Sequence, residues 1–293
     1  MNDTAHILVE GKRHDLGDGF VVRRMLPSAQ QRTVGPFVFF DHIGPVDLAP
    51  GRGVDVRPHP HIGLSTMTYL FDGVFTHRDS LGVVQDIRTG AVNWMTAGRG
   101  VVHSERTPEP ERSDGHRLHG VQFWVGLPKD DAEHEPFFSH HPIEELPEWS
   151  DDDGGVHCRL VAGEAFGRES PVAVFSRLFC IDITLQAGAE LLVPTEHPER
   201  AIRVAGGEIE VDGVILPMHQ MLILKRDVPV RIVAREQSRL VLFGGEPLDG
   251  PRFIWWNFVA ATRERIERAS EDWRKGHFDK VPGETEFIPL PAR

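Results

Sequence analysis

Cysteine is scarce in this chain, whose 293 residues include only Cys158 and Cys180. Two cysteines are too few for a disulfide framework, and they lack the CxxC spacing of a thiolate metal site. We therefore interpret both as reduced, buried thiols.

Long apolar runs and blocks of basic residues are also missing. No stretch approaches the roughly 20 apolar residues that a bilayer crossing requires, so no membrane association is expected. The N-terminus shows no basic segment followed by an apolar stretch and a cleavage site, which predicts a soluble cytoplasmic protein. A formal net charge of −12 repels phosphate and argues against direct nucleic-acid binding as a main role.

Short apolar, β-branched runs separated by Gly, Pro and Asp make up most of the chain. Turn signals recur roughly every 8 to 12 residues, a pattern that indicates an all-β barrel or sandwich. No segment resembles a dinucleotide-binding βαβ unit. Typical runs are GLSTMTYLF, VVQDIRTG, LHGVQFWVGL, LFCIDITLQAG and SRLVLFGGEPL.

A polar, acidic segment, SHHPIEELPEWSDDDGG, separates two groups of predicted strands. We interpret residues 139–155 as a linker or long exposed loop. This predicts an N-terminal barrel over residues 1–138 and a C-terminal barrel, with a helix and tail, over residues 156–293.

The helix is predicted late in the chain, within NFVAATRERIERASEDWRKG. Asn257 is expected to cap its start, and Gly276 is expected to end it. An apolar stripe along one side should pack on a barrel. The residues of this stripe are Val259, Ile266, Ala269 and Trp273.

Two pairs of polar residues have the spacing of metal ligands. His59 and His61 are two residues apart in RPHPHIGLSTMTYLFDG, and side chains two apart on a strand share one face. His103 and Glu105 repeat this spacing after a glycine-rich turn. The intervening sequence suffices for about four strands, so facing strands could present three imidazoles and one carboxylate to a single ion.

Prolines precede both histidines of the first pair. Pro58 and Pro60 restrict the backbone to extended conformations and would set the direction of the two rings. Because proline has no amide hydrogen to donate, this segment is predicted to be an edge or bulged strand.

The order of several motifs resembles the pirin family of the cupin superfamily over almost the whole chain. The motifs are GPFVFFDHIGP, RPHPHIGLSTMTYLFDG, HRDSLG, WMTAGRGVVHSE, LHGVQFWVGLP, WNFVAATRERIERASEDWRKG and VPGETEFIPLP. The resemblance implies a bicupin, two antiparallel β-barrels of which the N-terminal one holds one metal, usually iron. The implied metal ligands are His59, His61, His103 and Glu105.

Two departures from more general patterns bear on the number of metal sites. Ser65 and Thr66 occupy the positions where many cupins place a ligand Glu, so the carboxylate is expected from the second motif, as in other pirins. His197 and His219 lack a paired ligand two residues away. We therefore expect no metal in the C-terminal barrel and about one metal ion per chain.

The resemblance also implies an activity, the metal-dependent opening of the quercetin heterocycle by O2 with release of carbon monoxide. Glu105 would then be both ligand and acceptor of the flavonol hydroxyl proton. Fe(II) is the expected metal, and the ligand types also suit Mn, Co, Ni, Cu or Zn. A non-enzymatic, iron-dependent regulator that binds a transcriptional or metabolic protein partner is the main alternative, and a metal-dependent isomerase or storage cupin is a third.

Other polar residues could orient the imidazoles or line the entrance to the site. Among them His42 and Gln122 are favoured over Asp41, His77 and Asp79. The alternating apolar residues of the same strands are interpreted as barrel core. These residues are Phe37, Phe39, Met67, Phe123 and Trp124.

Overall fold

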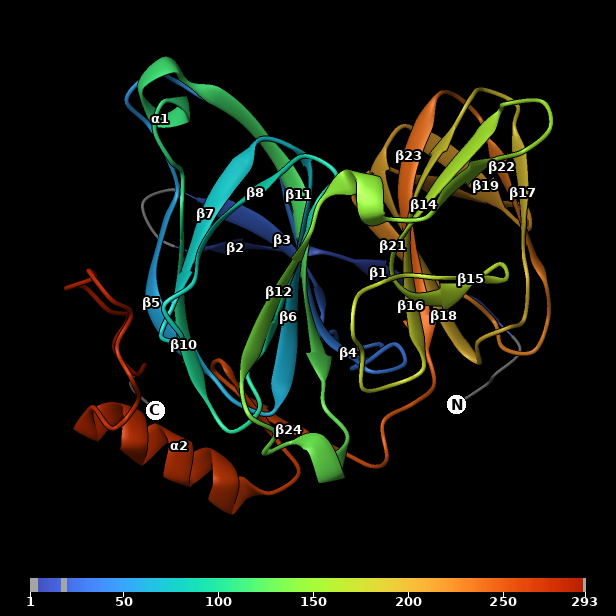
Figure 1. Ribbon diagram of the computed structural model, residues 1–293. Helices are drawn as coiled ribbons and strands as arrows, with labels where there is room; N and C mark the ends of the chain where they lie inside the picture. The colour runs from blue at the N-terminus through green and yellow to red at the C-terminus, as the bar shows by residue number, and fades with distance from the viewer. Residues whose placement is uncertain (1–4, 17–19, 292–293) are drawn as a thin grey trace. The chain divides into compact units, whose positions relative to one another are not determined.

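A computed structural model describes residues 5–16 and 20–291 of the chain. Strands dominate and pair antiparallel, and a single long helix lies near the C-terminus (Figure 1). The predicted all-β class with a late helix is therefore confirmed. No helix among the described residues has both the length and the apolar character needed to span a membrane.

The chain divides into two compact units, each assembled from separate segments. The unit with the paired histidines, called here the histidine barrel, consists of Arg13–Val22, Asp41–Ile143 and Leu248–Arg293. The second barrel consists of Met1–Lys12, Arg23–Phe40 and Glu144–Pro247.

These bounds differ from the linear division predicted above, because each barrel includes strands or helices from distant parts of the sequence. The described N-terminal strand β1 (Ile7–Glu10) pairs with β21 (Gln220–Ile223) of the second barrel. The late helix falls in the histidine barrel. Residues 139–155 hold the end of one strand, a 3₁₀ turn and a further short strand rather than a continuous loop.

The histidine barrel contains a seven-stranded sheet in the order β12-β9-β6-β11-β4-β3-β2 and a four-stranded sheet in the order β5-β10-β7-β8. Two of the boundaries between the two units fall inside strands of this sheet, one in β3 and one in β4. The strands of the larger sheet are β12 (Phe137–His141), β9 (Val92–Thr96), β6 (Leu64–Asp72), β11 (His116–Gly126), β4 (Phe37–Leu48), β3 (Val21–Leu26) and β2 (Lys12–Asp15). Those of the smaller sheet are β5 (Asp55–His61), β10 (Val101–Arg106), β7 (Val74–Asp79) and β8 (Val84–Arg88).

Shorter elements complete this barrel. They are the hairpin strands β24 (Phe253–Trp255) and β25 (Phe258–Ala260), the helices α1 (Glu111–Asp114) and α2 (Arg263–Lys275), and the 3₁₀ turns η1 (Lys129–Asp131) and η2 (Ile143–Glu145).

The second barrel has an eight-stranded sheet in the order β1-β21-β18-β23-β16-β14-β13, with β15 paired to β14, and a four-stranded sheet in the order β17-β22-β19-β20. The larger sheet adds β18 (Glu199–Gly206), β23 (Ser238–Gly245), β16 (Leu178–Leu185), β14 (Val156–Ala165), β13 (Glu148–Ser150) and β15 (Arg168–Glu169). The smaller sheet has β17 (Glu190–Val193), β22 (Val230–Ala234), β19 (Glu208–Val211) and β20 (Val214–Pro217).

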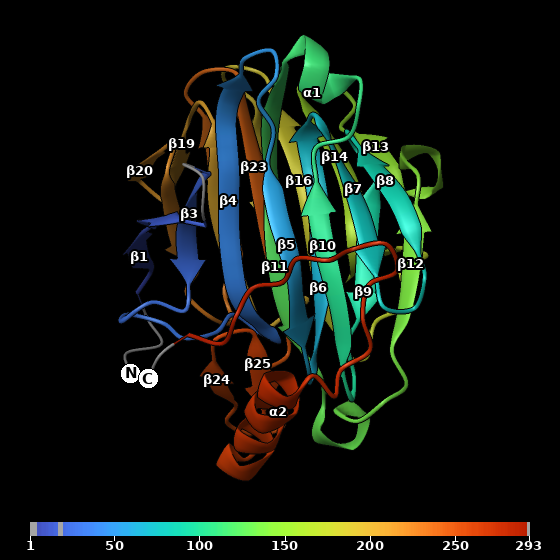
Figure 2. The same cartoon turned by 90° about the vertical axis from the view of Figure 1, so that its left-hand side faces the viewer.

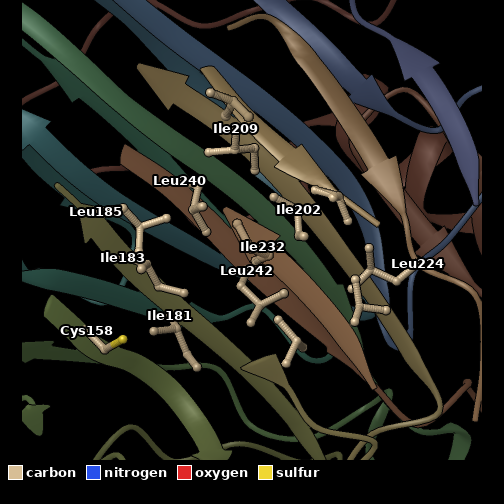
Figure 3. Close-up of a cluster of buried hydrophobic side chains, with 14 of the residues drawn as sticks. Cys158, Ile181, Ile183, Leu185, Ile202, Ile209, Leu224, Ile232, Leu240 and Leu242 are labelled. Carbon is tan, nitrogen blue, oxygen red and sulfur yellow. The ribbon is translucent and has the colours of Figure 1, made fainter. Parts of the chain in front are cut away.

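An aliphatic cluster fills the second barrel (Figure 3). Side chains such as Ile181, Ile202 and Leu242 alternate along their strands and are fully buried, as expected of strands with one face in a core. Cys158 belongs to this cluster, and both cysteines are free and buried, as predicted. Burial raises the pKa of the Cys158 thiol to about 12, so the thiol stays protonated and unreactive.

The late helix begins later than the sequence predicts. Thr262, not Asn257, caps α2 and accepts a hydrogen bond from the Arg265 amide. Asn257 and Val259 instead belong to the β24–β25 hairpin, whose aromatic residues favour strand over helix. The predicted end is confirmed, since Gly276 adopts the left-handed conformation at the C-cap.

The packing of α2 supports the strand that carries the first histidine pair. Ile266 and Ala269 are buried against Ile62 and Phe258, as the predicted apolar stripe requires, and Trp273 packs against the same cluster. Ile62 directly follows His61 at the end of β5. Helix and hairpin therefore hold the end of the histidine strand.

A turn at Gly63 separates the histidine pair from the strand that follows. His59 and His61 lie at the end of β5, and the strand that follows them in the sequence, β6, belongs to the other sheet. Gly63 has φ +66, and a Cβ there would lie 2.1 Å from the carbonyl oxygen of Val259. Only glycine fits this left-handed turn against the hairpin.

Candidate metal centre

Three histidines of the histidine barrel converge on one point. His59 and His61 extend from β5, and His103 extends from the neighbouring strand β10 directly opposite His59. One ring nitrogen of each lies within 4.8 Å of those of the other two. Their ring centroids are 4.4 to 5.0 Å apart. The predicted meeting of both motifs is realised for these three side chains, and four strands separate β5 from β10 as expected.

The prolines of β5 have the position that their chemistry predicts. β5 is the edge strand of its sheet and has β10 as its only neighbour in the strand order. An edge strand pairs with a neighbour on one side only, so it tolerates residues that lack an amide hydrogen, such as Pro58 and Pro60. The alternation of proline and histidine directs both imidazoles to the face shared with His103.

Backbone carbonyls orient two of the imidazoles. His59 Nδ1 lies 2.9 Å from the Arg57 oxygen, and His61 Nδ1 lies 3.0 Å from the Asn257 oxygen. A carbonyl only accepts, so each Nδ1 carries the hydrogen and each Nε2 keeps its lone pair. His103 Nε2 is buried without a hydrogen-bond partner. Three such lone pairs fit a divalent transition metal, for which imidazole is a common ligand.

Burial keeps the three rings in the form that binds metal. The pKa values of His61 and His103 lie well below the ordinary value, first because of burial and then because of the neighbouring histidines. Burial also lowers the pKa of His59, although its hydrogen bond to Arg57 and the charge of Glu105 act in the opposite direction. Neutral imidazoles offer lone pairs without prior loss of a proton.

Glu105 lies beside the triad but is not a member of it. Among the described residues, the group with ligand atoms within 4.8 Å of one another consists of the three histidines. The Glu105 carboxylate accepts hydrogen bonds from Gln122 Nε2 at 2.8 and 3.0 Å and from Thr68 Oγ1 at 3.2 Å. The pairing of β10 with β5 shifts register between His103 and Glu105. The site thus contains one buried carboxylate held by two neutral donors.

The two outer positions favoured by the sequence have different surroundings. Gln122 directly contacts Glu105. His42 instead lies 2.9 Å from His119, nitrogen to nitrogen, and its ring faces Phe71. Phe71 also contacts Tyr69, with ring centroids 5.8 Å apart. Tyr69 directly follows Thr68 on β6, so this group lies on the opposite face of the sheet from the one that reaches Glu105.

Two residues that the sequence did not favour as site residues contact the triad directly. Trp124, interpreted as core, packs edge-on against His61 with ring centroids 5.0 Å apart. It lies two residues from Gln122, so both extend from the same face of β11. His77, a less favoured candidate, has its Nδ1 3.5 Å from Nδ1 of His103. Spacing identifies the shared face but not which of its members touch.

The C-terminal segment crosses the outer side of the ligand-bearing strands (Figure 2). Ile288 donates its amide hydrogen to the Pro58 carbonyl at 2.8 Å. Glu284 accepts hydrogen bonds from Ser104 at 3.0 Å and from Arg106 at 2.7 and 3.0 Å. Ser104 and Arg106 alternate with His103 and Glu105 along β10. The C-terminal segment therefore binds the face of β10 opposite to the one that carries His103 and Glu105.

Glu284→Gln should lower the free energy of unfolding by about 1–2 kcal/mol near neutral pH, because it removes a charge-assisted contact to Arg106. Arg106 holds the pKa of Glu284 below its ordinary value of 4.5. The unfolded chain therefore takes up this proton first, and the stabilisation is lost as the pH falls below about 4.5. Urea unfolding of wild type and variant should show a difference that shrinks on acidification.

Glu286→Gln is the matched control. Glu286 pairs with the same Arg106, but its side chain is 56% exposed. Removing its charge should therefore lower the free energy of unfolding by less than about 0.5 kcal/mol. A stability gap for Glu284→Gln that stays constant or widens toward acid pH would contradict this assignment.

Neither histidine singled out in the second barrel joins a cluster of this kind. His197 is buried, stacks on Phe179 with centroids 4.5 Å apart, and lies 2.8 Å from the Glu164 carbonyl oxygen through Nε2. His219 adopts a left-handed backbone conformation next to β21. Within residues 5–16 and 20–291, the triad is the group of three ligand side chains that could hold a metal ion.

Comparisons with known proteins agree with the fold and the triad. Residues 19–125 match the Pirin family model, and residues 180–279 match the model of the pirin C-terminal cupin domain. A pirin-like protein from Caulobacter vibrioides is 49% identical over 97% of this chain and 99% of its own length. A Pseudomonas aeruginosa protein named "Putative quercetin 2,3-dioxygenase PA1205" is 37% identical over 92% of this chain and 85% of its own.

The fold also matches a solved structure over nearly its full length. The crystal structure of quercetin 2,3-dioxygenase from Acinetobacter baumannii superposes with a TM-score of 0.92 and 33% identity, covering 98% of this chain and 95% of that one. Both domain models match in order, and the histidine triad lies in the histidine barrel; the chain therefore belongs to the pirin family of bicupins.

Proposed function

We propose that this protein is a metal-dependent dioxygenase that opens the heterocycle of a flavonol such as quercetin with O2. The observation that carries the proposal is the pairing of three neutral, inward-facing imidazoles with one buried carboxylate. The names of the relatives from Pseudomonas and Acinetobacter support it.

His59, His61 and His103 would hold the metal through Nε2, with Glu105 as a fourth ligand. Fe(II) is our first choice, and Mn, Co, Ni, Cu and Zn suit the same donors. When bound, the metal would act as a Lewis acid that lowers the pKa of the flavonol 3-hydroxyl and would offer open positions for O2-dependent chemistry.

The protein's own groups would bind the substrate and manage its proton. Glu105 can accept the hydroxyl proton, because its carboxylate is an acceptor held in place by Gln122 and Thr68. Trp124 offers a flat apolar surface beside His61 for a planar ring. Burial of the triad keeps bulk water away from the reacting groups.

We place this reaction in the cytoplasm. Cys158 and Cys180 are both free, which suits a reducing compartment.

The test is an aerobic assay of the iron-loaded protein with quercetin. Loss of the flavonol absorption, with release of carbon monoxide, is expected from loaded protein and not from protein treated with a chelator. A fully loaded metal site without turnover on any flavonol would overturn the proposal and would favour an iron-dependent regulator that binds a protein partner.

A further inference from the structure

His103 is the first of three buried polar side chains in a row, followed by His77 and Asp79. His103 Nδ1 is 3.5 Å from His77 Nδ1, and His77 Nε2 is 2.9 Å from Asp79 Oδ2. All three are at most 4% exposed. They extend from the paired strands β7 and β10, in which Asp79 lies opposite His103. The other ring nitrogen of His103, Nε2, is buried without a hydrogen-bond partner.

The far end of the row is rigid. Asp79 Oδ1 accepts the amide hydrogens of Leu81 at 2.9 Å and Val83 at 3.1 Å, which leaves Oδ2 for His77. The His77 ring stacks on Phe138 with centroids 4.5 Å apart and an angle of 22° between the planes. Neither Asp79 nor His77 can turn away without losing these contacts.

The direction of each hydrogen bond follows from the one before it. A carboxylate only accepts, so His77 Nε2 must carry a hydrogen. In neutral His77 the other nitrogen, Nδ1, then has only a lone pair, and His103 Nδ1 must donate to it. With its hydrogen on Nδ1, His103 presents an unprotonated Nε2 to His59 and His61.

We propose that Asp79 and His77 are positioning residues that keep the proton of His103 on Nδ1 and so leave Nε2 free for the metal. The inference rests on the proposed metal centre, and it extends that centre by two residues that the ligand set does not include. It also accounts for a buried carboxylate and a buried imidazole next to a site that needs neither as a ligand.

Asp79→Asn tests this directly, because it changes the direction of hydrogen bonding with little change of shape. The two backbone amides of Leu81 and Val83 require an oxygen, so they fix the orientation of the new amide group. Its NH2 then faces His77 Nε2, which must become the acceptor. The proton shifts along both rings and ends on His103 Nε2.

Two readouts should follow this shift. In the metal-free protein, nitrogen-15 spectra of histidine should show His103 as the Nδ1–H tautomer in wild type and as the Nε2–H tautomer in Asp79→Asn. Competition with a chelator for Co²⁺ should show a loss of metal affinity of about 10- to 100-fold, as found for outer partners of metal-bound histidines.

His77→Phe separates this effect from a structural one. Phenylalanine retains the stack on Phe138 but removes the nitrogens that link Asp79 to His103. Neither tautomer of His103 is then enforced, so the loss of metal affinity should be smaller than in Asp79→Asn. In the His77→Phe background, Asp79→Asn should have no further effect on affinity. An equal loss from Asp79→Asn in both backgrounds, or an unchanged His103 tautomer, would overturn the proposal.

His197→Phe is the matched control. His197 also stacks on a phenylalanine at 4.5 Å and bonds an oxygen through Nε2, but it lies in the second barrel. It should leave the His103 tautomer and the Co²⁺ affinity unchanged. Because neither readout uses turnover, a correct tautomer with no quercetin reaction would refute the dioxygenase alone.

Discussion

His103→Ala is expected to leave the protein without tightly bound metal. His103 is one of only three imidazoles in the triad, and it is the member supplied by β10. Without His103, the two imidazoles of β5 and the proposed ligand Glu105 would hold the ion much less tightly. The loss of affinity should exceed the roughly 10- to 100-fold that changes of outer partners cause.

Metal analysis and thermal unfolding together check this prediction. Wild type should contain about one metal ion per chain, because the described residues hold a single complete histidine set. Metal at about 1,000 times its dissociation constant stabilises a protein by about 4 kcal/mol, and this added stability should disappear in His103→Ala. A metal content equal to that of wild type would contradict the assignment, whereas His197→Ala should retain both metal and the metal-dependent stabilisation.

Glu105→Gln should give the second large effect, a fall in turnover of about 100- to 10,000-fold, the range attributed to a positioned proton acceptor. The amide preserves the shape and can still accept a hydrogen bond from Gln122 through its remaining oxygen. It removes the negative charge beside His59 and the group that can take the hydroxyl proton. The measurement is the rate of flavonol loss at matched metal content.

Gln122→Met is the companion variant for this experiment. It keeps the charge on Glu105 but removes the donor at 2.8 and 3.0 Å, so it should reduce turnover less than Glu105→Gln does. If Glu105→Gln reacted at the wild-type rate with metal bound, the carboxylate would have no part in the chemistry. The triad could still bind metal in that case.

The local pattern of the chain was sufficient for several features of the fold and site. The spacing of His59 and His61 predicts a shared face because strand side chains alternate, and Pro58 and Pro60 predict an edge strand because they lack a donor. Gly276 predicts the end of α2 because glycine readily adopts the left-handed cap. Each of these inferences depends only on neighbours within a few residues.

Helix start and domain bounds were harder to predict because they depend on distant segments. Asn257 has the chemistry of a helix cap, but its carbonyl accepts from His61 in a hairpin that packs against β5. Similarly, β1 joins the second barrel by pairing with β21, more than 200 residues later. No local composition signals a pairing over that separation.

By itself, the sequence determined the all-β class, the motif order of a pirin and the histidines that meet in the first barrel, because these follow from side-chain alternation and residue chemistry. Tertiary structure alone decided that Glu105 contacts Gln122 and that His42 lies on the opposite face of its sheet. It likewise decided that His77 and Asp79 form the row behind His103. Such choices depend on strand register and on which buried donor meets which acceptor, and neither is encoded in the spacing along a single strand.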